Sequence, residues 1–567
     1  MTFRQLRWGI LGAAILAIIT SLPQAYLCYE RGSEWNGAYA YFDSDEFAYS
    51  AYVNALIDGR PRRNDPYTGE DGGAYETLFS IQFIPAYSIA IPARLLGISA
   101  STAFIILVPV ITVASTLILF VFLFEITQDA FFSAIGAVGV LSFGVLAAQT
   151  PLKLFWAPVL FPFLRRYLPA FPFPFFFAMT LFVWRALIKN SLVYAFVSGL
   201  TLVVLIYSYF FLWTAAAAWL VVLLILWVVA RPREYWRVLR VFGVIGLIGV
   251  VALVPYLWLL AHRAPVIAQA QLLEFTHRPD LFRGSEWYGV AIGIVVSRLV
   301  IHNLNWQNPR ILFLLSFALA PLMVFNHQVV TGHSLQPFHY DQFIANYWIL
   351  TAMFLAVGLA ARNLPKRVPI YLAIGSFAVG LILALHAAAS GLDSNREVDR
   401  ARSVALKLKG HYGVAFVSGL GTDTLATTAS LPVLWSQYSY TFSHVDLSNE
   451  KIRFYKYLYY SGVSAENLTM LLERPGYIVR KETFGADRAN LALKPNSQPI
   501  TEEDIQQAVQ DFSAFSLAFT REQASTPRLS HAVVSPNDNL SNLDRWYERD
   551  SGERVGAYMI YRVKLRE

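Results

Sequence analysis

The sequence has few charged residues and almost no cysteine. Asp, Glu, Lys and Arg make up 15% of the 567 residues, against about 25% in an ordinary soluble domain. The single cysteine, Cys28, has no partner within the chain, which excludes a scaffold of internal disulfides. Apolar residues make up 56%, too many for a disordered chain. The composition predicts a multi-spanning membrane protein, whose net charge of +7 reflects cytoplasmic loop ends rather than nucleic-acid binding.

Several motifs of nucleotide and nucleophile chemistry are also absent. The sequence has no Walker loop, no Rossmann glycine fingerprint, no Gly-x-Ser-x-Gly elbow and no zincin helix. We therefore expect no nucleotide cofactor and no nucleophilic serine.

The composition changes near residue 390. Residues 1–390 consist of apolar runs with short polar gaps, and residues 391–567 mix charges, turns and amphipathic stretches. The tail is long enough to bury its own core. We expect it to be a soluble extracytoplasmic domain of α/β or α+β type. Its patterns predict a buried strand at 413–421, helices around 448–473 and 501–518, and strands around 476–480 and 557–563.

The first part predicts an α-helical polytopic membrane protein. A spanning helix needs about 20 mostly apolar residues. The candidates are 8–28, 103–124, 130–149, 170–188, 192–209, 211–230, 239–261, 286–303, 310–326, 341–361 and 367–388. We therefore expect about eleven spans. A further run, 78–97, contains two prolines, Gln82 and Arg94, and we interpret it as an interfacial helix.

This division fixes the expected topology. About eleven Lys and Arg residues then lie in cytoplasmic loops and about six in the short outer loops, as the positive-inside rule requires. We expect an integral protein, taken to belong to a bacterial inner membrane, with its N-terminus in the cytoplasm and its C-terminal domain outside.

One polar cluster lies in the long outer loop 29–77. Asp43, Asp45 and Glu46 stand directly before a helical stretch that contains Tyr49, which can share a helix face with either of the last two. Crowded carboxylates near a bilayer have shifted pKa values, and one of them could act as a general base or bind a metal. The alternative is a solvated acidic loop that caps the helix.

A second cluster lies in the proline-rich segment 150–177, where Lys153, Arg165 and Arg166 stand among aromatic residues. Guanidinium groups bind phosphate bidentately. The alternative is that these side chains snorkel at an aromatic interfacial belt.

The third cluster is segment 326–343, which holds His327, His333, His339 and Asp341. The histidine spacing matches no common zinc signature. We interpret these side chains as hydrogen-bonding groups for a sugar or lipid phosphate, or as groups satisfied within the loop.

The order of these parts resembles the GT-C superfamily, integral membrane glycosyltransferases that use polyprenyl-phosphate-linked sugars. The resemblance is carried by Asp45-Glu46-x-x-Tyr49 after the first membrane helix and by Asp58-Gly59-Arg60-Pro61 after the following helix. An interfacial segment, an outer loop two spans later and an outer tail domain follow in the family's order. The paired prolines of the mannosyltransferase and aminoarabinose branches are absent, as is the Trp-Trp-Asp motif of oligosaccharyltransferases, so no subfamily is assigned.

The resemblance implies an inverting transfer of a hexose or pentose from a polyprenyl-phosphate donor to a glycan, lipid or protein acceptor. This reaction would belong to cell-envelope glycan biosynthesis and would take place among membrane lipids. We expect no nucleic-acid partner. Asp45 or Glu46 would be the base, with Asp45 favoured. The donor phosphate and substrate would be bound by Asp43, Tyr49, Lys153, Arg165, Arg166, His333 and His339. Some members use a divalent metal such as Mg²⁺ or Mn²⁺, for which Asp43, Asp45 and Glu46 offer oxygen ligands.

A transporter or lipid flippase is the main alternative, and a non-catalytic scaffold for the tail domain is a second. A transporter would carry ionisable residues in mid-span and paired broken helices. In this sequence the spans are nearly free of ionisable residues and the polar residues concentrate in outer loops, which favours interfacial chemistry.

Overall fold

The computed structural model describes residues 1–147, 164–264, 274–275, 278–281, 283–303, 305–360, 365, 367–419, 421–442, 447–474, 476–489 and 498–567. Every predicted span coincides with a helix. These helices are α1 (Phe3–Arg31), α5 (Ala100–Thr127), α6 (Ala130–Ala147), α7 (Phe173–Lys189), α8 (Leu192–Ile206), α9 (Phe210–Ala230), α10 (Tyr235–Ala261), α12 (Gly284–Asn303), α13 (Pro309–Asn326), α16 (Asn346–Ala360) and α17 (Arg367–Ser390). Seven helices of the described chain are long and apolar enough to cross a membrane, and α6 and α8 are apolar but shorter.

Glycines allow the membrane helices to approach closely. A Cβ at Gly144 would lie 2.3 Å from the ring of Tyr347, and one at Gly289 would lie 2.0 Å from the carbonyl oxygen of Ala318. The contacts of α6 with α16 and of α12 with α13 therefore require glycine, as is common where membrane helices pack on small residues.

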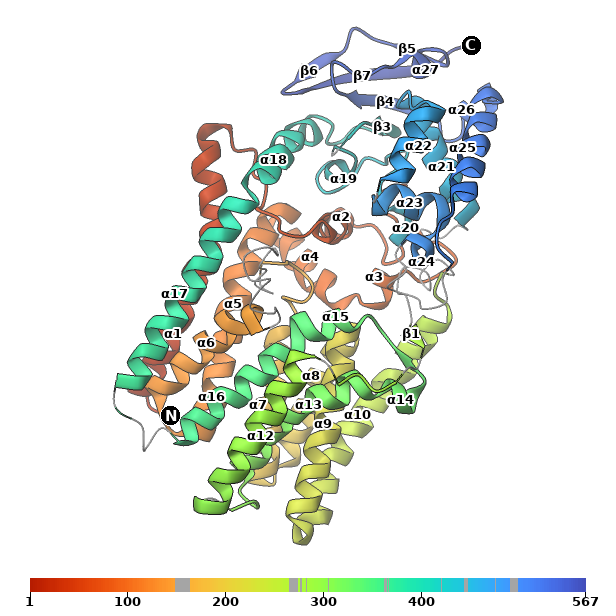
Figure 1. The fold of residues 1–567 in the computed structure, drawn as a ribbon. Coiled ribbons are helices and arrows are strands. Elements are labelled where there is room, and N and C mark those ends of the chain that lie inside the picture. The colour runs from red at the N-terminus through yellow and green to blue at the C-terminus, as the bar shows by residue number, and fades with distance from the viewer. Residues whose placement is uncertain are drawn as a thin grey trace.

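The N-terminus and the C-terminal domain lie at opposite ends of this bundle (Figure 1). The turn between α9 and α10 includes η3 (Pro232–Glu234) and carries Arg231 and Arg233, and Arg237 follows in the first turn of α10. This turn lies at the end away from the C-terminal domain (Figure 1). The positive-inside rule favours the cytoplasm for such a turn, and the orientation of the chain in the membrane stays a prediction.

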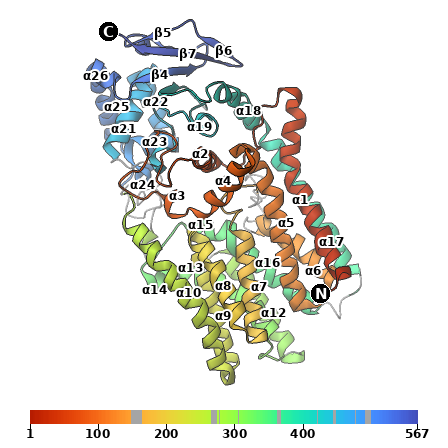
Figure 2. The same cartoon turned by 180° about the vertical axis from the view of Figure 1, so that it is seen from behind.

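Three short helices lie between the bundle and the C-terminal domain (Figure 2). They are α2 (Asp45–Ile57), α3 (Leu78–Ile81) and α4 (Ile84–Leu96). Segment 78–97 therefore forms two helices, and α4, with 13 residues, is too short to span a bilayer. Thr77 caps α3 by accepting the backbone N–H of Ser80.

Short elements complete the end of the bundle that faces the C-terminal domain. They are η1 (Gly32–Glu34), α14 (Gln328–Thr331), α15 (Pro337–Tyr340), the π-helix η4 (Asp341–Ala345), and an antiparallel pair of β1 (Glu274–Phe275) and β2 (His333–Ser334).

The C-terminal domain is built on a small mixed sheet. Its strand order is β3-β4-β7-β5, with β6 paired to β7. The strands are β3 (Val414–Val417), β4 (Leu529–Val534), β5 (Tyr547–Arg549), β6 (Glu553–Val555) and β7 (Tyr558–Leu565). β3 is parallel to β4, and the other pairs are antiparallel. The domain's helices are α18 (Leu392–Lys407), α19 (Gly421–Ala426), α20 (Ser439–Phe442), α21 (Leu447–Tyr460), α22 (Ala465–Glu473), α23 (Tyr477–Phe484), α24 (Ala486–Ala489), α25 (Glu502–Leu517), α26 (Arg521–Ala524) and α27 (Ser541–Asp544).

Most of the elements predicted in the tail are confirmed. The strands expected at 413–421 and 557–563 are β3 and β7, and the expected helices are α21, α22 and α25. The strand expected at 476–480 is wrong, because these residues begin helix α23. Val479 and Phe484 on this helix pack against the helical core cluster. A short apolar run does not distinguish a strand from a buried helix.

Candidate active site

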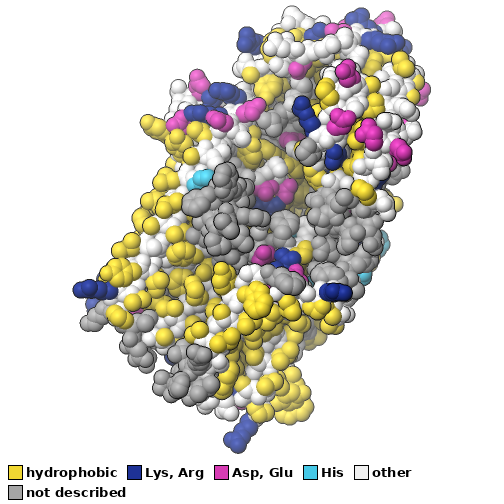
Figure 3. Space-filling model, viewed as in Figure 1, with side chains coloured by type: hydrophobic (Ala, Val, Ile, Leu, Met, Phe, Trp, Pro, Cys, Tyr) yellow, Lys and Arg dark blue, Asp and Glu magenta, His cyan; other side chains and the backbone are white. Residues whose placement is uncertain are grey.

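A cavity of about 500 Å³ lies at the end of the bundle that faces the C-terminal domain. Its walls come from the start of α2, from α3, from residues 165–168, from the start of α9 and from the region of α15 and η4. The lining residues are Asp43, Ser44, Asp45, Tyr49, Leu78, Phe79, Gln82, Arg165, Tyr167, Leu168, Tyr209, Phe210, Phe211, Leu335, Gln336, His339, Gln342 and Phe343. Figure 3 shows acidic and basic side chains set back in the middle of this face, between the apolar bundle and the C-terminal domain.

Arg165 joins two carboxylates of the acidic cluster, which we define as Asp43, Asp45 and Glu46. Arg165 Nη2 donates to Asp45 Oδ2 at 2.5 Å, and Arg165 Nε lies 3.3 Å from Asp43 Oδ2. The backbone N–H of Asp45 donates to Asp43 Oδ1 at 2.9 Å, which fixes the first turn of α2. The Arg165 side chain is 5% exposed, whereas that of Asp45 is 49% exposed. Asp45 therefore presents an accessible carboxylate beside a buried cation.

Opposing effects act on the pKa of Asp45. The surrounding protein removes water from the carboxylate and raises its pKa, and the negative charge of Asp43 acts in the same direction. The Arg165 guanidinium opposes this rise by its charge and its hydrogen bond. A carboxyl group whose pKa is shifted in this way, in a cleft, is typical of a group that exchanges protons in a reaction.

Glu46 and Arg166, the adjacent residues in sequence, form a second pair that does not line the cavity. Glu46 Oε2 lies 3.3 Å from Arg166 Nη1, and both side chains are buried, at 0% and 2% exposed. Arg166 also donates Nη1 to the Ala40 carbonyl at 2.6 Å and Nε to the Phe104 carbonyl at 3.0 Å. Burial raises the pKa of Glu46 to about 7, and Arg166 opposes this shift. This pair ties the first loop to the bundle and is not accessible to a substrate.

Aromatic rings pack around Arg165. Its guanidinium lies 5.8 Å from the ring centre of Tyr49 and 5.5 Å from that of Phe343, distances at which a cation is attracted to a ring face. Tyr49 in turn stacks on Tyr167 with ring centres 4.7 Å apart. Asp45 and Tyr49 both line the cavity, which is the shared helix face that their spacing predicts.

His339 lies in the cavity wall as a hydrogen-bonding group. Its Nε2 is 2.9 Å from Gln336 Oε1, which can only accept, and its Nδ1 is 3.0 Å from the Tyr209 hydroxyl. The ring stacks on Phe211 at 4.2 Å. Burial, and then the charge of Arg165, lower the pKa of His339 well below its usual range. The imidazole is therefore neutral near pH 7.

Of the predicted site residues that the structure describes, His333 lies away from the cavity, as Glu46 and Arg166 do. His333 lies on β2, where it pairs with Phe275, and it does not contribute to the cavity lining. Lys153 falls outside the described residues. Among the described residues, each of the three polar clusters contributes to the cavity lining: Asp43, Asp45 and Tyr49 from the first, Arg165 from the second and His339 from the third.

Several other lining residues are not predicted from the sequence. Tyr209, Gln336 and Gln342 contribute polar groups to the cavity. Gln82 does so as well, although its only effect on the sequence pattern is to disfavour a span. Tyr209 stands where α8 has ended and α9 has not begun. A tyrosine at a break between two apolar runs is the available signal, since irregular backbone at membrane depth is tolerated where it lines a cavity.

The acidic cluster does not fit a divalent metal well. Asp43 and Asp45 share the Arg165 guanidinium, and Glu46 faces Arg166. Among the described ranges no group of three His, Cys, Asp or Glu side chains is arranged to hold a metal ion. The countercharge of these carboxylates is provided by arginine.

No protein-family model matches the chain, and no curated protein matches its sequence. Nineteen chains of solved structures align with it, among them the following two. ArnT from Cupriavidus metallidurans bound to undecaprenyl phosphate is 11% identical, with a TM-score of 0.47, over 97% of this chain and 97% of that chain. The archaeal oligosaccharyltransferase AglB from Archaeoglobus fulgidus, in complex with an inhibitory peptide and a dolichol-phosphate, is 12% identical, with a TM-score of 0.47, over 99% of this chain and 74% of that chain. Both are GT-C glycosyltransferases, the superfamily that the sequence resembles, and at this identity the likeness assigns neither substrate nor activity to this chain.

Proposed function

We propose that the protein is a membrane glycosyltransferase that moves a sugar from a polyprenyl-phosphate donor to an acceptor hydroxyl at the outer face of the membrane. The observation that carries the proposal is the Asp45 carboxylate. It is half-exposed in a cavity at the outer end of a membrane bundle and contacts a buried arginine. An accessible carboxylate in a cavity that can hold the acceptor hydroxyl within hydrogen-bond reach can act as the base of an inverting transfer.

In the proposed reaction Asp45 takes the proton of the acceptor hydroxyl. The acceptor oxygen forms a bond to the anomeric carbon, and the bond from that carbon to the phosphate oxygen breaks. The electron pair leaves with the polyprenyl phosphate. Arg165 favours the ionised form of Asp45 before the reaction, and its remaining N–H groups lie in the same wall of the cavity. They would stabilise the charge that develops on the leaving phosphate.

The rest of the lining suits a sugar with an apolar anchor. The amides of Gln82, Gln336 and Gln342 can donate to and accept from sugar hydroxyls, and Phe210 and Phe211 offer apolar faces. A few placed polar groups in a mostly apolar wall are typical of small-molecule sites. Neutral His339 fits the role of a hydrogen-bonding residue better than that of a countercharge for phosphate.

The proposal is tested by supplying the purified protein with labelled donors of two kinds. A panel of polyprenyl-phosphate hexoses and pentoses is compared with the matching nucleotide sugars, and a membrane extract serves as acceptor. We expect loss of sugar from one or more lipid donors, with release of polyprenyl phosphate, and no use of nucleotide sugars. The sugar that is consumed distinguishes hexosyl from pentosyl transfer. A lipid donor that crosses a vesicle membrane with its sugar intact would instead identify a flippase.

A further inference from the structure

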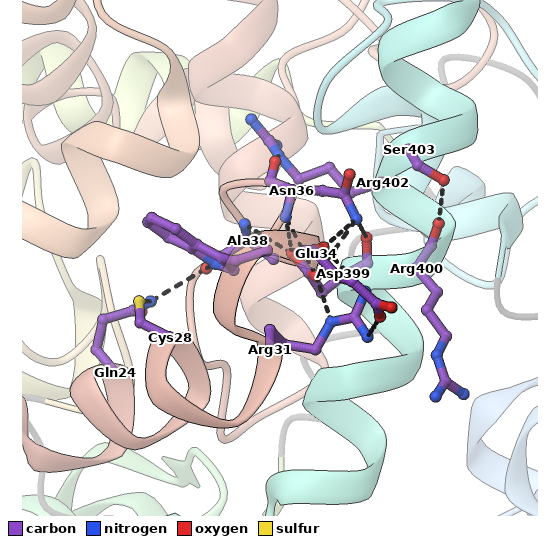
Figure 4. Close-up of polar contacts among 11 residues, drawn as sticks. Gln24, Cys28, Arg31, Glu34, Asn36, Ala38, Asp399, Arg400, Arg402 and Ser403 are labelled. Atoms are coloured by element: carbon purple, nitrogen blue, oxygen red, sulfur yellow. Dashed lines mark hydrogen bonds and ion pairs between the residues drawn. The ribbon is translucent and has the colours of Figure 1, made fainter. Parts of the chain in front are cut away.

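A buried carboxylate of the C-terminal domain holds the chain that leads to the acidic cluster (Figure 4). Asp399 lies on α18 and is 0% exposed. Its carboxylate accepts hydrogen bonds from Arg31 Nε at 2.8 Å, from the backbone N–H of Asn36 at 2.9 Å and from that of Ala38 at 3.2 Å. Its backbone carbonyl also accepts the side-chain amide of Asn36 at 3.1 Å. A single residue therefore binds the end of α1 and the loop that follows.

Two further residues on the same face of α18 extend these contacts. Asn395 accepts the backbone N–H of Tyr41 at 2.7 Å and donates Nδ2 to the Tyr41 carbonyl at 3.2 Å. Arg402 donates Nε to the Asn36 carbonyl at 3.0 Å. Asn395 lies four positions before Asp399 and Arg402 three positions after it, which places the three side chains on one helix face. We call residues 36–41 the anchored segment, because α18 binds the backbone at both of its ends.

The anchored segment has no regular secondary structure of its own. Ala38 and Ala40 are nevertheless buried, at 3% and 1% exposed, and buried backbone polar groups require partners. Side chains supply them, since Gln24 accepts the backbone N–H of Ala40 at 2.7 Å, in addition to the contacts from α18. The path of this segment is therefore determined by side chains from other parts of the chain.

The anchored segment ends two residues before Asp43. Because one residue spans at most about 3.6 Å, a displacement at Tyr41 reaches the start of α2 with little room for compensation. Arg165 is held through its neighbour Arg166, which donates to the carbonyls of Phe104 on α5 and of Ala40. The position of Asp45 relative to Arg165 thus depends on α18 as well as on the Glu46–Arg166 pair.

We propose that Asp399, together with Asn395, is a positioning residue for the glycosyl transfer. The two residues line no part of the cavity. They hold the anchored segment so that the Asp45 carboxylate stays in contact with Arg165. This inference rests on the proposed role of Asp45 as the base, and it gives the C-terminal domain a part in the reaction that needs no contact with substrate.

The test compares Asp399→Asn with Asp393→Asn. Both substitutions remove an acid from α18, but the Asp393 side chain is 98% exposed, so Asp393→Asn is the matched control. We expect Asp399→Asn to lower kcat roughly 10- to 100-fold, the scale of a small misplacement at a reacting centre, with little change in KM for the donor. The acid limb of its pH–rate profile should move to higher pH, because an Asp45 carboxylate that has lost its contact with Arg165 binds its proton more tightly. Asp393→Asn should change neither.

A second measurement does not depend on activity. Hydrogen exchange of the resting protein reports on the backbone N–H groups that Asp399 and Asn395 accept, and Asp399→Asn should accelerate exchange in the anchored segment only. Unchanged exchange there, or a loss of activity that is uniform with pH, would overturn the inference. If Asp399→Asn does not accumulate, the same two measurements are made on Asn395→Ala, which removes the side-chain contacts to Tyr41 and one hydrogen bond to the Gly391 carbonyl. Faster exchange in the anchored segment, combined with full transfer by Asp45→Asn, would refute the assignment of the base and leave the anchoring contacts intact.

Discussion

Replacing Asp45 by asparagine should remove most of the transfer and little of the stability. A positioned general base contributes roughly 10²- to 10⁴-fold to a rate, which corresponds to about 3–5 kcal/mol of barrier. Asparagine has the same shape but accepts no proton. The Asp45 side chain is 49% exposed, and a half-exposed ion pair contributes about 1 kcal/mol or less to the free energy of unfolding. The variant should therefore fold and be inactive.

Asp43→Asn is the matched control. Asp43 lies two positions earlier, its side chain is 29% exposed, and it contacts the same guanidinium at 3.3 Å. Each substitution removes one carboxylate from Arg165, so the loss that both variants share measures the effect on that arginine. The excess loss in Asp45→Asn measures the base. We expect Asp43→Asn to stay within about tenfold of the original protein, since a lost ion pair of this kind is worth about 1 kcal/mol.

The measurement is single-turnover transfer from the polyprenyl-phosphate donor by purified protein, with thermal unfolding in the same detergent as the check on folding. Single-turnover rates exclude product release from the comparison. Equal activity of Asp45→Asn and Asp43→Asn would refute the reasoning, because it would mean that the accessible carboxylate takes no proton in the rate-limiting step.

Three further predictions concern the same charges. Arg165→Gln removes the main countercharge of Asp45 and thus raises the pKa of Asp45. Since a base works only when ionised, the acid limb of the pH–rate profile should move to higher pH. An acid limb at the original pH would contradict this. Transfer should continue in EDTA, because Asp43 and Asp45 already share a guanidinium; a loss that Mg²⁺ or Mn²⁺ restores would show that a metal is needed. The pKa of Glu46 is raised to about 7, so the folded state retains a proton that the unfolded state releases from about pH 4.5 upward. The free energy of unfolding therefore falls as pH rises from about 4.5 to about 7, by at most about 3 kcal/mol. Glu46→Gln should therefore flatten the fall of Tm between pH 5 and pH 8, and Tm curves parallel to those of the original protein would count against it.

The membrane helices could be predicted because their signal is local. Each span is a run of apolar residues, and the runs coincide with helices from α1 to α17. The same local reasoning failed at α23, where a run of three apolar residues, 477–479, indicates a strand. Here the outcome depends on packing against α21 and α22, to which a short window has no access.

The sequence indicates which segments carry the polar residues, but only the fold shows which of these residues line the cavity and which are buried elsewhere. Successive residues on a helix point about 100° apart, so Asp45 and Glu46 cannot face the same surroundings. Sequence spacing does not say which of them faces the cavity. The contacts of Asp399 with Asn36 were also beyond reach, because they join residues 363 positions apart.

The Asp45–Arg165 and Glu46–Arg166 pairs have different roles. Asp45 contacts Arg165 and Glu46 contacts Arg166, so the start of α2 and the arginine segment meet in one register. The buried pair, with backbone carbonyls from residues 40 and 104 around Arg166, fixes that register, since separating it would leave a charge without a partner in the interior. The Asp45–Arg165 pair is positioned by the same register, and its Asp45 side chain remains accessible. A carboxylate that exchanges a proton with substrate must be accessible, so it cannot also be the buried group that holds the two segments together. Because Asp45 and Glu46 are adjacent in sequence, one of them can be accessible while the other is buried.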